Sequence, residues 1–237
     1  MKQTLYLQIE RWLISNYRFL TQRVDATGIL GISPRQKIMT AIRLLATGCS
    51  SDDVDDRSRI AESTMLDILD CFCAAIIEQY GKEFLREPTE HDLGIILRDN
   101  ERDGWPGMLG SIDCMHWKWK NCPKAWAGMY QGKESAPTIV LQAIADRNGR
   151  IWHQYFGMPG SSNDINVYDR SNVLHSALNG QSPRINYTVN NREYSIGYWL
   201  GDGIYPKHAC FVKAYKPPFL IDVAKQELFT KKQESRR

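Results

Sequence analysis

Residues 108–120 read MLGSIDCMHWKWK, and here the chain changes from helix-forming to strand-forming sequence. The stretch is short, rich in aromatic side chains and bounded by Gly107 and Pro123, which is typical of a β-strand. Asp113 lies inside it, where a charged residue suits neither strand propensity nor burial. A carboxylate in this position needs a partner, so Asp113 is the first candidate for a functional residue.

Strand signals continue downstream of this stretch. The runs PTIVLQAIAD (137–146) and IWHQYFG (151–157) are β-rich, and the Asn148-Gly149 pair between them predicts a type I′ hairpin. Two later runs flank Asn190-Asn191 and predict a second hairpin or an inserted strand pair. The second of these runs leads into GDGIYP (201–206), so the chain carries several strands in succession.

Two acids lie next to these strands. The segment SSNDINVYDRSNVLHSAL (161–178) predicts a helix, and Asp164 stands at its start, where Asn163 and Ser162 are alternative caps. Asp202 follows the last predicted strand and precedes a glycine. A strand-borne acid and an acid after a strand also have structural explanations, as a satisfied core acid and as an ordinary turn.

The first hundred residues predict helices separated by short breaks. One helix is expected over residues 34–48, with Pro34 in its first turn, and a third over residues 89–97. Between them, residues 62–81 carry an apolar stripe at helical spacing. Thr64 and Asp67 have the form of a capping box for this helix, and Gly81 suits its end.

The sequence of the helical region predicts a packing or partner-binding role for it. The acidic run over residues 52–56 is expected to be a solvated turn. Residues 57–79 could form a helix-turn-helix, but the helix after Ile60 carries acids and no Lys or Arg, which suits a DNA groove poorly. We therefore predict an all-α region over residues 1–104 and a strand-containing domain over residues 105–237.

Composition limits the class of protein. The formal charge of +3 neither supports nor excludes DNA binding, since phosphate-binding proteins usually concentrate their basic residues on one surface. The six cysteines show no CxxC pair and no zinc-finger spacing, which predicts reduced thiols. Charges interrupt the apolar N-terminal run, and no stretch of about 18 apolar residues occurs. A soluble intracellular protein is expected.

The spacing of Asp113 and Asp202 suggests metal chemistry. The order of strand, hairpin, helix and strand, with acids on the first and last strands, suits a two-metal phosphoryl-transfer site. Neighbouring strands can hold two carboxylates close enough to share Mg²⁺ ions. Such ions activate an attacking water or 3′-hydroxyl and stabilise the leaving oxygen.

Several blocks resemble one family. DATGILGIS, GSIDCMHWKWKNCPKAWAGMYQG, PTIVLQAIAD, WHQYFGMPGSSNDINVYDRS and GYWLGDGIYP are similar, in this order, to blocks of the plant Harbinger/PIF transposase-derived nucleases of the DDE superfamily. The resemblance implies an α/β, RNase H-like mixed sheet with flanking helices. It also implies an acidic triad binding two divalent ions, Mg²⁺ or Mn²⁺, DNA as the substrate, and a nuclear location with the cytoplasm as a second one.

The resemblance assigns roles to individual residues. Asp113, in IDCMHW, matches the first acid of the triad, and Asp202, in GDGIYP, matches the second. Asp164, in SSNDINV, is also characteristic of the family, although its place at a helix start makes capping the simpler explanation. The family's third acid is a Glu on a helix that continues beyond the last residues of this sequence. Glu234 would lie on the same face about two turns earlier.

The resemblance and the composition together give two expectations of function. The first is a metal-dependent DNA endonuclease, weak or inactive without the third acid, with Lys118, Lys120 and Lys124 as candidate DNA contacts beside exposed tryptophans. An amphipathic edge strand explains the same basic and aromatic stretch equally well. The second is a domesticated non-catalytic protein that binds chromatin partners. Harbinger elements are associated with a separate Myb-like DNA-binding protein, which is the expected partner.

Overall fold

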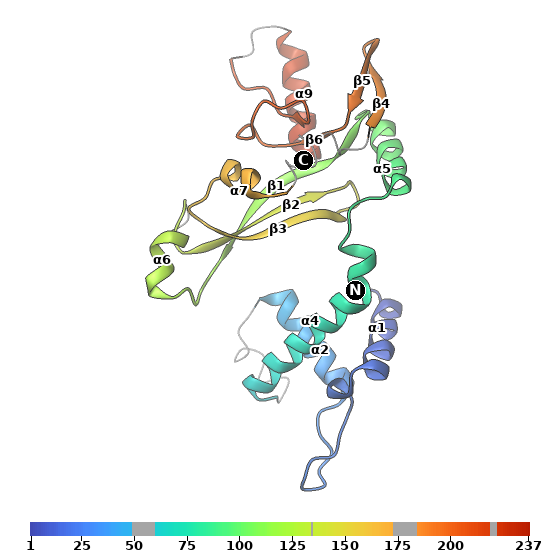
Figure 1. Ribbon diagram of the computed structural model, residues 1–237, viewed down its shortest axis with the longest axis vertical. Helices are drawn as coiled ribbons and strands as arrows, with labels where there is room; N and C mark the ends of the chain where they lie inside the picture. Colours follow the sequence, from blue (N-terminus) through green and yellow to red (C-terminus); the bar gives the residue numbers. More distant parts are fainter. Residues whose placement is uncertain (49–59, 134, 173–183, 219–221) are drawn as a thin grey trace. The chain divides into compact units, whose positions relative to one another are not determined.

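The computed structural model describes residues 1–48, 60–133, 135–172, 184–218 and 222–237 (Figure 1). The chain forms two compact units, Met1–Phe84 and Leu85–Arg237, which we describe separately. The sequence predicted a change of character after residue 104, within the second unit, and that position stays a prediction for a domain boundary. Along the described ranges, no helix is both long and apolar enough to cross a membrane.

The first unit is helical, as predicted. It contains α1 (Gln3–Asn16), the short 3-10 helix η1 (Arg18–Leu20), α2 (Pro34–Thr47) and α4 (Glu62–Phe84). Their apolar faces share one core, which includes the fully buried Leu13, Ile38 and Met65. Burial of these side chains therefore contributes to the stability of this unit.

The ends of these helices test the predicted caps. Ser33 caps α2, with Pro34 in the first turn, and Gly48 ends it at a positive φ of 58°, as predicted. The helix α4 begins at Glu62, as the predicted segment does, but the predicted cap and end were wrong, because Thr64 follows its first residues and the helix continues through Gly81 to Phe84. Thr64 is therefore inside the helix rather than at its cap. The acidic run over residues 52–56 and the start of the possible helix-turn-helix lie outside the described residues.

The second unit is built on a mixed five-stranded sheet. Its strands are β1 (Met108–Lys118), β2 (Thr138–Ala145), β3 (Ile151–Pro159), β6 (Tyr198–Leu200) and β7 (Phe211–Val212), in the order β3-β2-β1-β6-β7. β2 is antiparallel to both β1 and β3, whereas β6 is parallel to β1 and to β7. The predicted mixed α/β class is confirmed, and the arrangement is consistent with an RNase H-like fold.

Helices and a separate hairpin flank this sheet. The helices are α5 (Glu90–Arg102), α6 (Lys124–Tyr130), α7 (Asp164–Arg170) and α9 (Val223–Arg236), and the hairpin pairs β4 (Arg184–Val189) with β5 (Arg192–Ile196). Figure 1 shows α6 at one end of the long strand β1, and α5 with the β4–β5 hairpin at the other. The final part of the predicted helix over residues 161–178 lies outside the described residues.

The two hairpins differ in their turns. Both residues of Asn190-Asn191 have positive φ, at 51° and 62°, as a type I′ turn requires. The predicted turn pair between β2 and β3 is Asn148-Gly149. Only Gly149 has a positive φ, at 76°. The type I′ prediction was therefore wrong there. The Asp146 side chain accepts hydrogen bonds from the backbone N–H groups of Asn148 and Arg150, and it stabilises a three-residue loop instead.

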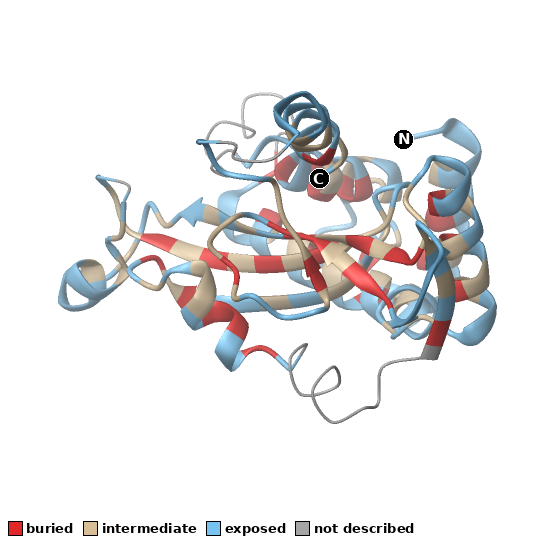
Figure 2. Ribbon diagram, turned by 90° about the horizontal axis from the view of Figure 1, so that it is seen from above, coloured by how far each residue is buried: buried red, intermediate tan, exposed pale blue. Residues whose placement is uncertain are grey.

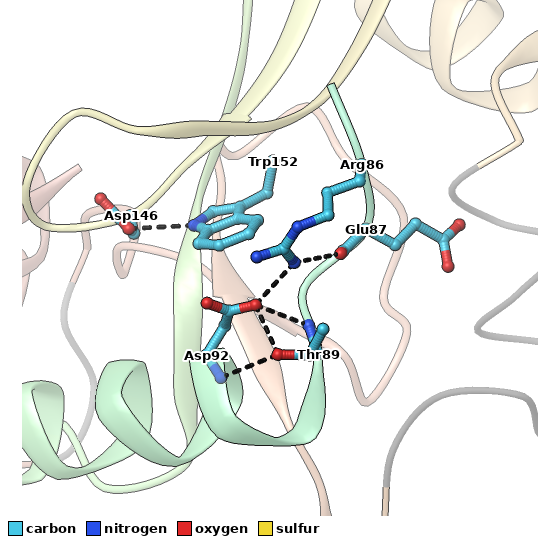
Figure 3. Close-up of polar contacts among 6 residues, drawn as sticks. All are labelled: Arg86, Glu87, Thr89, Asp92, Asp146 and Trp152. Atoms are coloured by element: carbon cyan, nitrogen blue, oxygen red, sulfur yellow. Dashed lines mark hydrogen bonds and ion pairs between the residues drawn. The ribbon is translucent and has the colours of Figure 1, made fainter. Parts of the chain in front are cut away.

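A network of polar contacts joins the start of α5 to the β2–β3 hairpin (Figure 3). Thr89 and Asp92 form a reciprocal capping box, and Arg86 donates to Asp92 Oδ2 at 2.6 Å. These bonds hold the pKa of the Asp92 carboxyl well below its usual range. The Arg86 guanidinium also lies 5.7 Å from the Trp152 ring, whose indole N–H donates to Asp146. The network fixes where α5 meets the sheet.

The buried residues of the second unit lie along the central strands (Figure 2). On one face, Ile112 packs with Tyr168 of α7 and with Tyr205. At the start of β1, Met108 packs with Tyr198 and Leu200. The second half of β1 is more exposed, with Met115 at 57% and Trp117 at 53% relative exposure. Beyond Asp113, therefore, one face of β1 is open.

Candidate functional site

Asp113 lies on β1, and Asp202 lies two residues after the end of β6, the neighbouring parallel strand. Ser111 of β1 pairs with Leu200 of β6, and each acid follows its strand's member of this pair by two residues. Both acids therefore lie where the pairing of β1 with β6 ends. Both side chains are exposed to solvent. The sheet topology thus brings together two residues that are 89 positions apart in the sequence.

The Asp202 loop is held by α9. Gln233 is almost fully buried, and its amide donates to the carbonyl oxygens of Gly201 at 3.1 Å and Val212 at 3.3 Å. Arg237, four residues later on the same face, has its guanidinium 3.7 Å from Asp202 Oδ1. The helix therefore runs toward the acids, and its last residue supplies a positive charge beside one of them.

Glu234 lies near the end of α9, and the role considered for it from the sequence stays a prediction. Its side chain is exposed, whereas the preceding residue, Gln233, faces the sheet. A helix presents neighbouring residues about 100° apart, so only one of the two can face β6. The carbonyl groups at the end of β6 require a donor there, which suits Gln233 and not a carboxylate.

Asp164 lies in the first turn of α7 and is half-buried. The cap of this helix is Asn163, whose side chain accepts from the N–H of Asn166 at 2.9 Å, so Asp164 is not the cap. Burial raises the pKa of the Asp164 carboxyl, and the negative charges of Asp113 and Asp202 raise it further. Asp164 therefore lies within the electrostatic field of the two strand acids.

The same acids affect a thiol on the other face of β1. Burial raises the pKa of Cys114 to about 11, with Asp164 and Asp113 adding to the shift. Its sulfur lies 3.6 Å from the hydroxyl oxygen of the buried Tyr205. Cys114 also packs against the core cluster of Val140, Met158 and Val167. Cys114 therefore acts as a packing residue behind the acids.

The chemistry of this donor set fits a hard divalent cation. Carboxylate oxygens are the ligands that Mg²⁺ and Mn²⁺ prefer. Burial first, and then the negative charges of Asp113 and Asp202, raise the pKa of Asp164, and a bound cation would offset those charges. Within the described ranges, no three His, Cys, Asp or Glu side chains are arranged as a ready-made metal cage. Because Mg²⁺ is commonly held by one or two carboxylates and water, the arrangement suits a water-rich site.

The candidate DNA-contacting lysines lie at the far end of β1. Lys118 is the last residue of the strand, Lys120 lies in the following turn, and Lys124 begins α6, all three with exposed side chains. Beside them Trp119 packs between Trp126 and Tyr130, at ring distances of 6.0 and 4.9 Å. The basic and aromatic residues therefore form one exposed end of the second unit, and their role stays a prediction.

A cavity of about 710 Å³ lies at the end of the second unit away from these lysines. Its wall is mainly apolar and includes Trp105, Tyr187, Tyr194 and Phe229, with α9 on one side and the β4–β5 hairpin on another. Neither Asp113 nor Asp202 contributes to it. Size alone therefore does not identify the functional site, because the acidic groups gather elsewhere.

Comparison with known proteins defines the class. Residues 82–237 match the model of a family described as plant transposon protein. The match covers nearly all of the second unit and more than half of the chain, so this chain belongs to that family. The match also confirms the resemblance that the sequence blocks predicted.

The similarity to individual curated proteins is low, at 23% identity. Two of them carry the name "Putative nuclease HARBI1". The protein from Rattus norvegicus is 23% identical over 171 residues, which cover 71% of this chain and 48% of the relative. The protein from Homo sapiens is 23% identical over 201 residues, or 84% of this chain and 55% of the relative. The chain thus spans about half the length of these relatives. No solved structure matches it.

Proposed function

We propose that this protein is a transposase-derived DNA endonuclease that depends on a divalent metal ion, Mg²⁺ or Mn²⁺. The observation that carries the proposal is that Asp113 and Asp202 each follow the paired residues Ser111 and Leu200 of β1 and β6 by two positions, and that both act electrostatically on Asp164. Membership of a transposon family and similarity to proteins named as nucleases support the same reaction class.

The three acids have different proposed roles. Asp113 and Asp202 are the metal ligands, because each is exposed and emerges where the strands separate. Asp164 is a third, weaker ligand, because its carboxylate is half-buried and already pays a desolvation cost. A bound divalent ion at such a site supplies a nucleophile at neutral pH and stabilises the leaving oxygen of a phosphodiester.

The surroundings of the acids suit a nucleic-acid substrate. We assign Lys118, Lys120 and Lys124 to contacts with DNA phosphates, since they lie along the strand that carries Asp113 and on the helix that follows. A DNA substrate implies a nuclear site of action. A separate Myb-like DNA-binding protein remains the proposed partner, because α4, the candidate recognition helix, carries no Lys or Arg before Lys82.

A nicking assay on supercoiled plasmid DNA tests this function. We expect slow nicking with Mg²⁺ or Mn²⁺, none with a chelator, and a loss of at least about 100-fold in the Asp113→Asn and Asp202→Asn variants. Asp169→Asn is the matched control, because Asp169 is an exposed carboxylate of α7 outside the proposed site. Nicking that survives in both strand variants would contradict the proposal.

One observation favours a second function, that of a non-catalytic protein that binds chromatin partners. The Arg237 guanidinium beside Asp202 offers a protein cation where a metal ion would bind. If the chain binds DNA but neither nicks it nor binds Mn²⁺, this second function replaces the first. Arg237→Gln separates the two, because removal of the competing charge should strengthen metal binding in a nuclease.

A further inference from the structure

A polar cavity of about 350 Å³ lies directly beside Asp164. Its wall comes from the end of β1, from the segment after α6 and from the loop before α7. The polar lining residues are His116, Gln131, Lys133, Ser161, Ser162 and Asp164. Three chain segments therefore converge on one small space next to the acids, as in a ligand subsite.

Several hydrogen-bond donors lie on this wall. His116 Nδ1 lies 3.1 Å from the hydroxyl oxygen of the buried Thr138, which fixes the plane of the ring. Among the described residues, the other ring nitrogen, Nε2, makes no hydrogen bond. Lys133 contributes an ammonium group, and Ser161 and Ser162 contribute hydroxyls. Such a set can satisfy several oxygen atoms of one anion.

Two glycines keep the wall in place. A Cβ at Gly132 would lie 1.9 Å from the carbonyl oxygen of Gly160, and a Cβ at Gly160 would lie 1.9 Å from the Thr138 hydroxyl oxygen. Only glycine allows these two loops to approach so closely. Because Thr138 also contacts His116, the loops and the ring form one packed unit. The cavity is therefore pre-formed.

The charges around the cavity favour an anion that approaches the acids together with a cation. The ammonium group of Lys133 and the carboxylate of Asp164 both line this cavity. The cavity thus lies at the border between a negative and a positive region. A phosphodiester beside a metal ion has this same alternation of charge.

We propose that this cavity binds a backbone phosphate of DNA next to the phosphodiester that is cut, with Lys133 as its ion-pair partner and His116, Ser161 and Ser162 as donors. The proposal rests on the proposed nuclease function, because it names how that site holds its substrate strand. Lys133 is accordingly a positioning residue rather than a catalytic one.

The test is the salt dependence of binding to a labelled DNA duplex, measured by fluorescence anisotropy with a chelator present. Each phosphate contact contributes about 0.9 to the slope of log K against log salt concentration. We expect Lys133→Gln to reduce that slope by about 0.9 and to weaken binding. Arg192→Gln, at the tip of the β4–β5 hairpin, removes the same charge and should leave the slope unchanged.

Each outcome decides the subsite independently of the nuclease reaction. A slope for Lys133→Gln equal to that of the parent overturns the subsite, whatever the nicking assay shows. Inorganic phosphate should displace the duplex from the parent beyond the effect of KCl at equal ionic strength, and should do so less for Lys133→Gln; equal displacement from both would also overturn the subsite. Because the chelator removes metal ions, failure of the metal site alone leaves the expected change in slope intact.

Discussion

The two halves of β1 differ in what surrounds them. From Met108 to Ile112 the strand is covered by neighbouring strands and helices, and Met108 and Ile112 are almost fully buried. From Asp113 onward the pairing with β6 has ended, and one face carries Asp113, Met115 and Trp117 with exposed side chains. One strand therefore serves packing in its first half and presents polar and aromatic groups in its second.

The difference shows how a fold can support a site without being stabilised by it. Side chains of the first half contribute apolar burial, which is the dominant favourable term in folding. Asp113 contributes none, and its charge sits where solvent and ligands can reach it. Substitutions in the first half should therefore mainly lower stability, and substitutions in the second half should mainly weaken binding.

The largest effect is expected in the buried half. Ile112→Ala removes a fully buried side chain that packs against Tyr168 and Tyr205, and should lower the free energy of unfolding by about 2–5 kcal/mol. Met115→Ala, on the same strand but 57% exposed, is the control and should change it by less than about 0.5 kcal/mol. Equal losses in urea denaturation would remove the distinction between the halves.

A smaller effect is expected at the exposed aromatic end. Trp117→Ala should weaken DNA binding by about 1–3 kcal/mol if a base stacks on this half-exposed ring. Its stability should remain near that of the parent, because the ring is not part of a buried core. Anisotropy measurements on single-stranded DNA check this. Unchanged affinity, or a large loss of stability, would place Trp117 with the packing residues.

Substitution of the half-buried Asp164 should have a moderate effect on metal binding. Asp164→Asn removes a half-buried carboxylate that already feels the charges of Asp113 and Asp202, and should weaken Mn²⁺ binding by about 10-fold, or ~1.4 kcal/mol. Calorimetric titration of the variant measures the change. An affinity equal to that of the parent would confine the metal site to the two strand acids.

The smallest effect concerns pH. Burial lowers the pKa of His153 on β3, while Glu87 opposes the shift. The folded state then binds fewer protons than the unfolded state, so stability should fall as the pH drops through the unfolded value of about 6.5 toward the lower folded pKa. His153→Gln should flatten the dependence of the melting temperature on pH in this window. An identical pH profile for the variant would exclude His153 as its cause.

Much of the fold was predictable because its signals are local. The β-rich runs 137–146 and 151–157, and the helical stripe of α4, can be recognised within each segment alone. The ends were less predictable. Gly81 lies inside α4, where the packing of Tyr80 against the core outweighs the preference of glycine for a helix end.

The candidate site was only partly predictable. Asp113 and Asp202 stand out as acids in strand surroundings, and the structure places them on neighbouring strands, while their metal-binding role stays a prediction. The Gln233 anchor and the cavity beside Lys133 had no local signal. The first depends on the contact of α9 with β6, and the second on the close approach of Gly132 and Gly160, which no single segment reveals.

The central claim is that Asp113 and Asp202 bind the same metal ion, and calorimetric titration with Mn²⁺ tests it most directly. Asp113→Asn and Asp202→Asn should each abolish the same binding event, and the double variant should lose no more than either single one. Binding that persists unchanged in either single variant, with the fold intact by circular dichroism, would contradict a shared site.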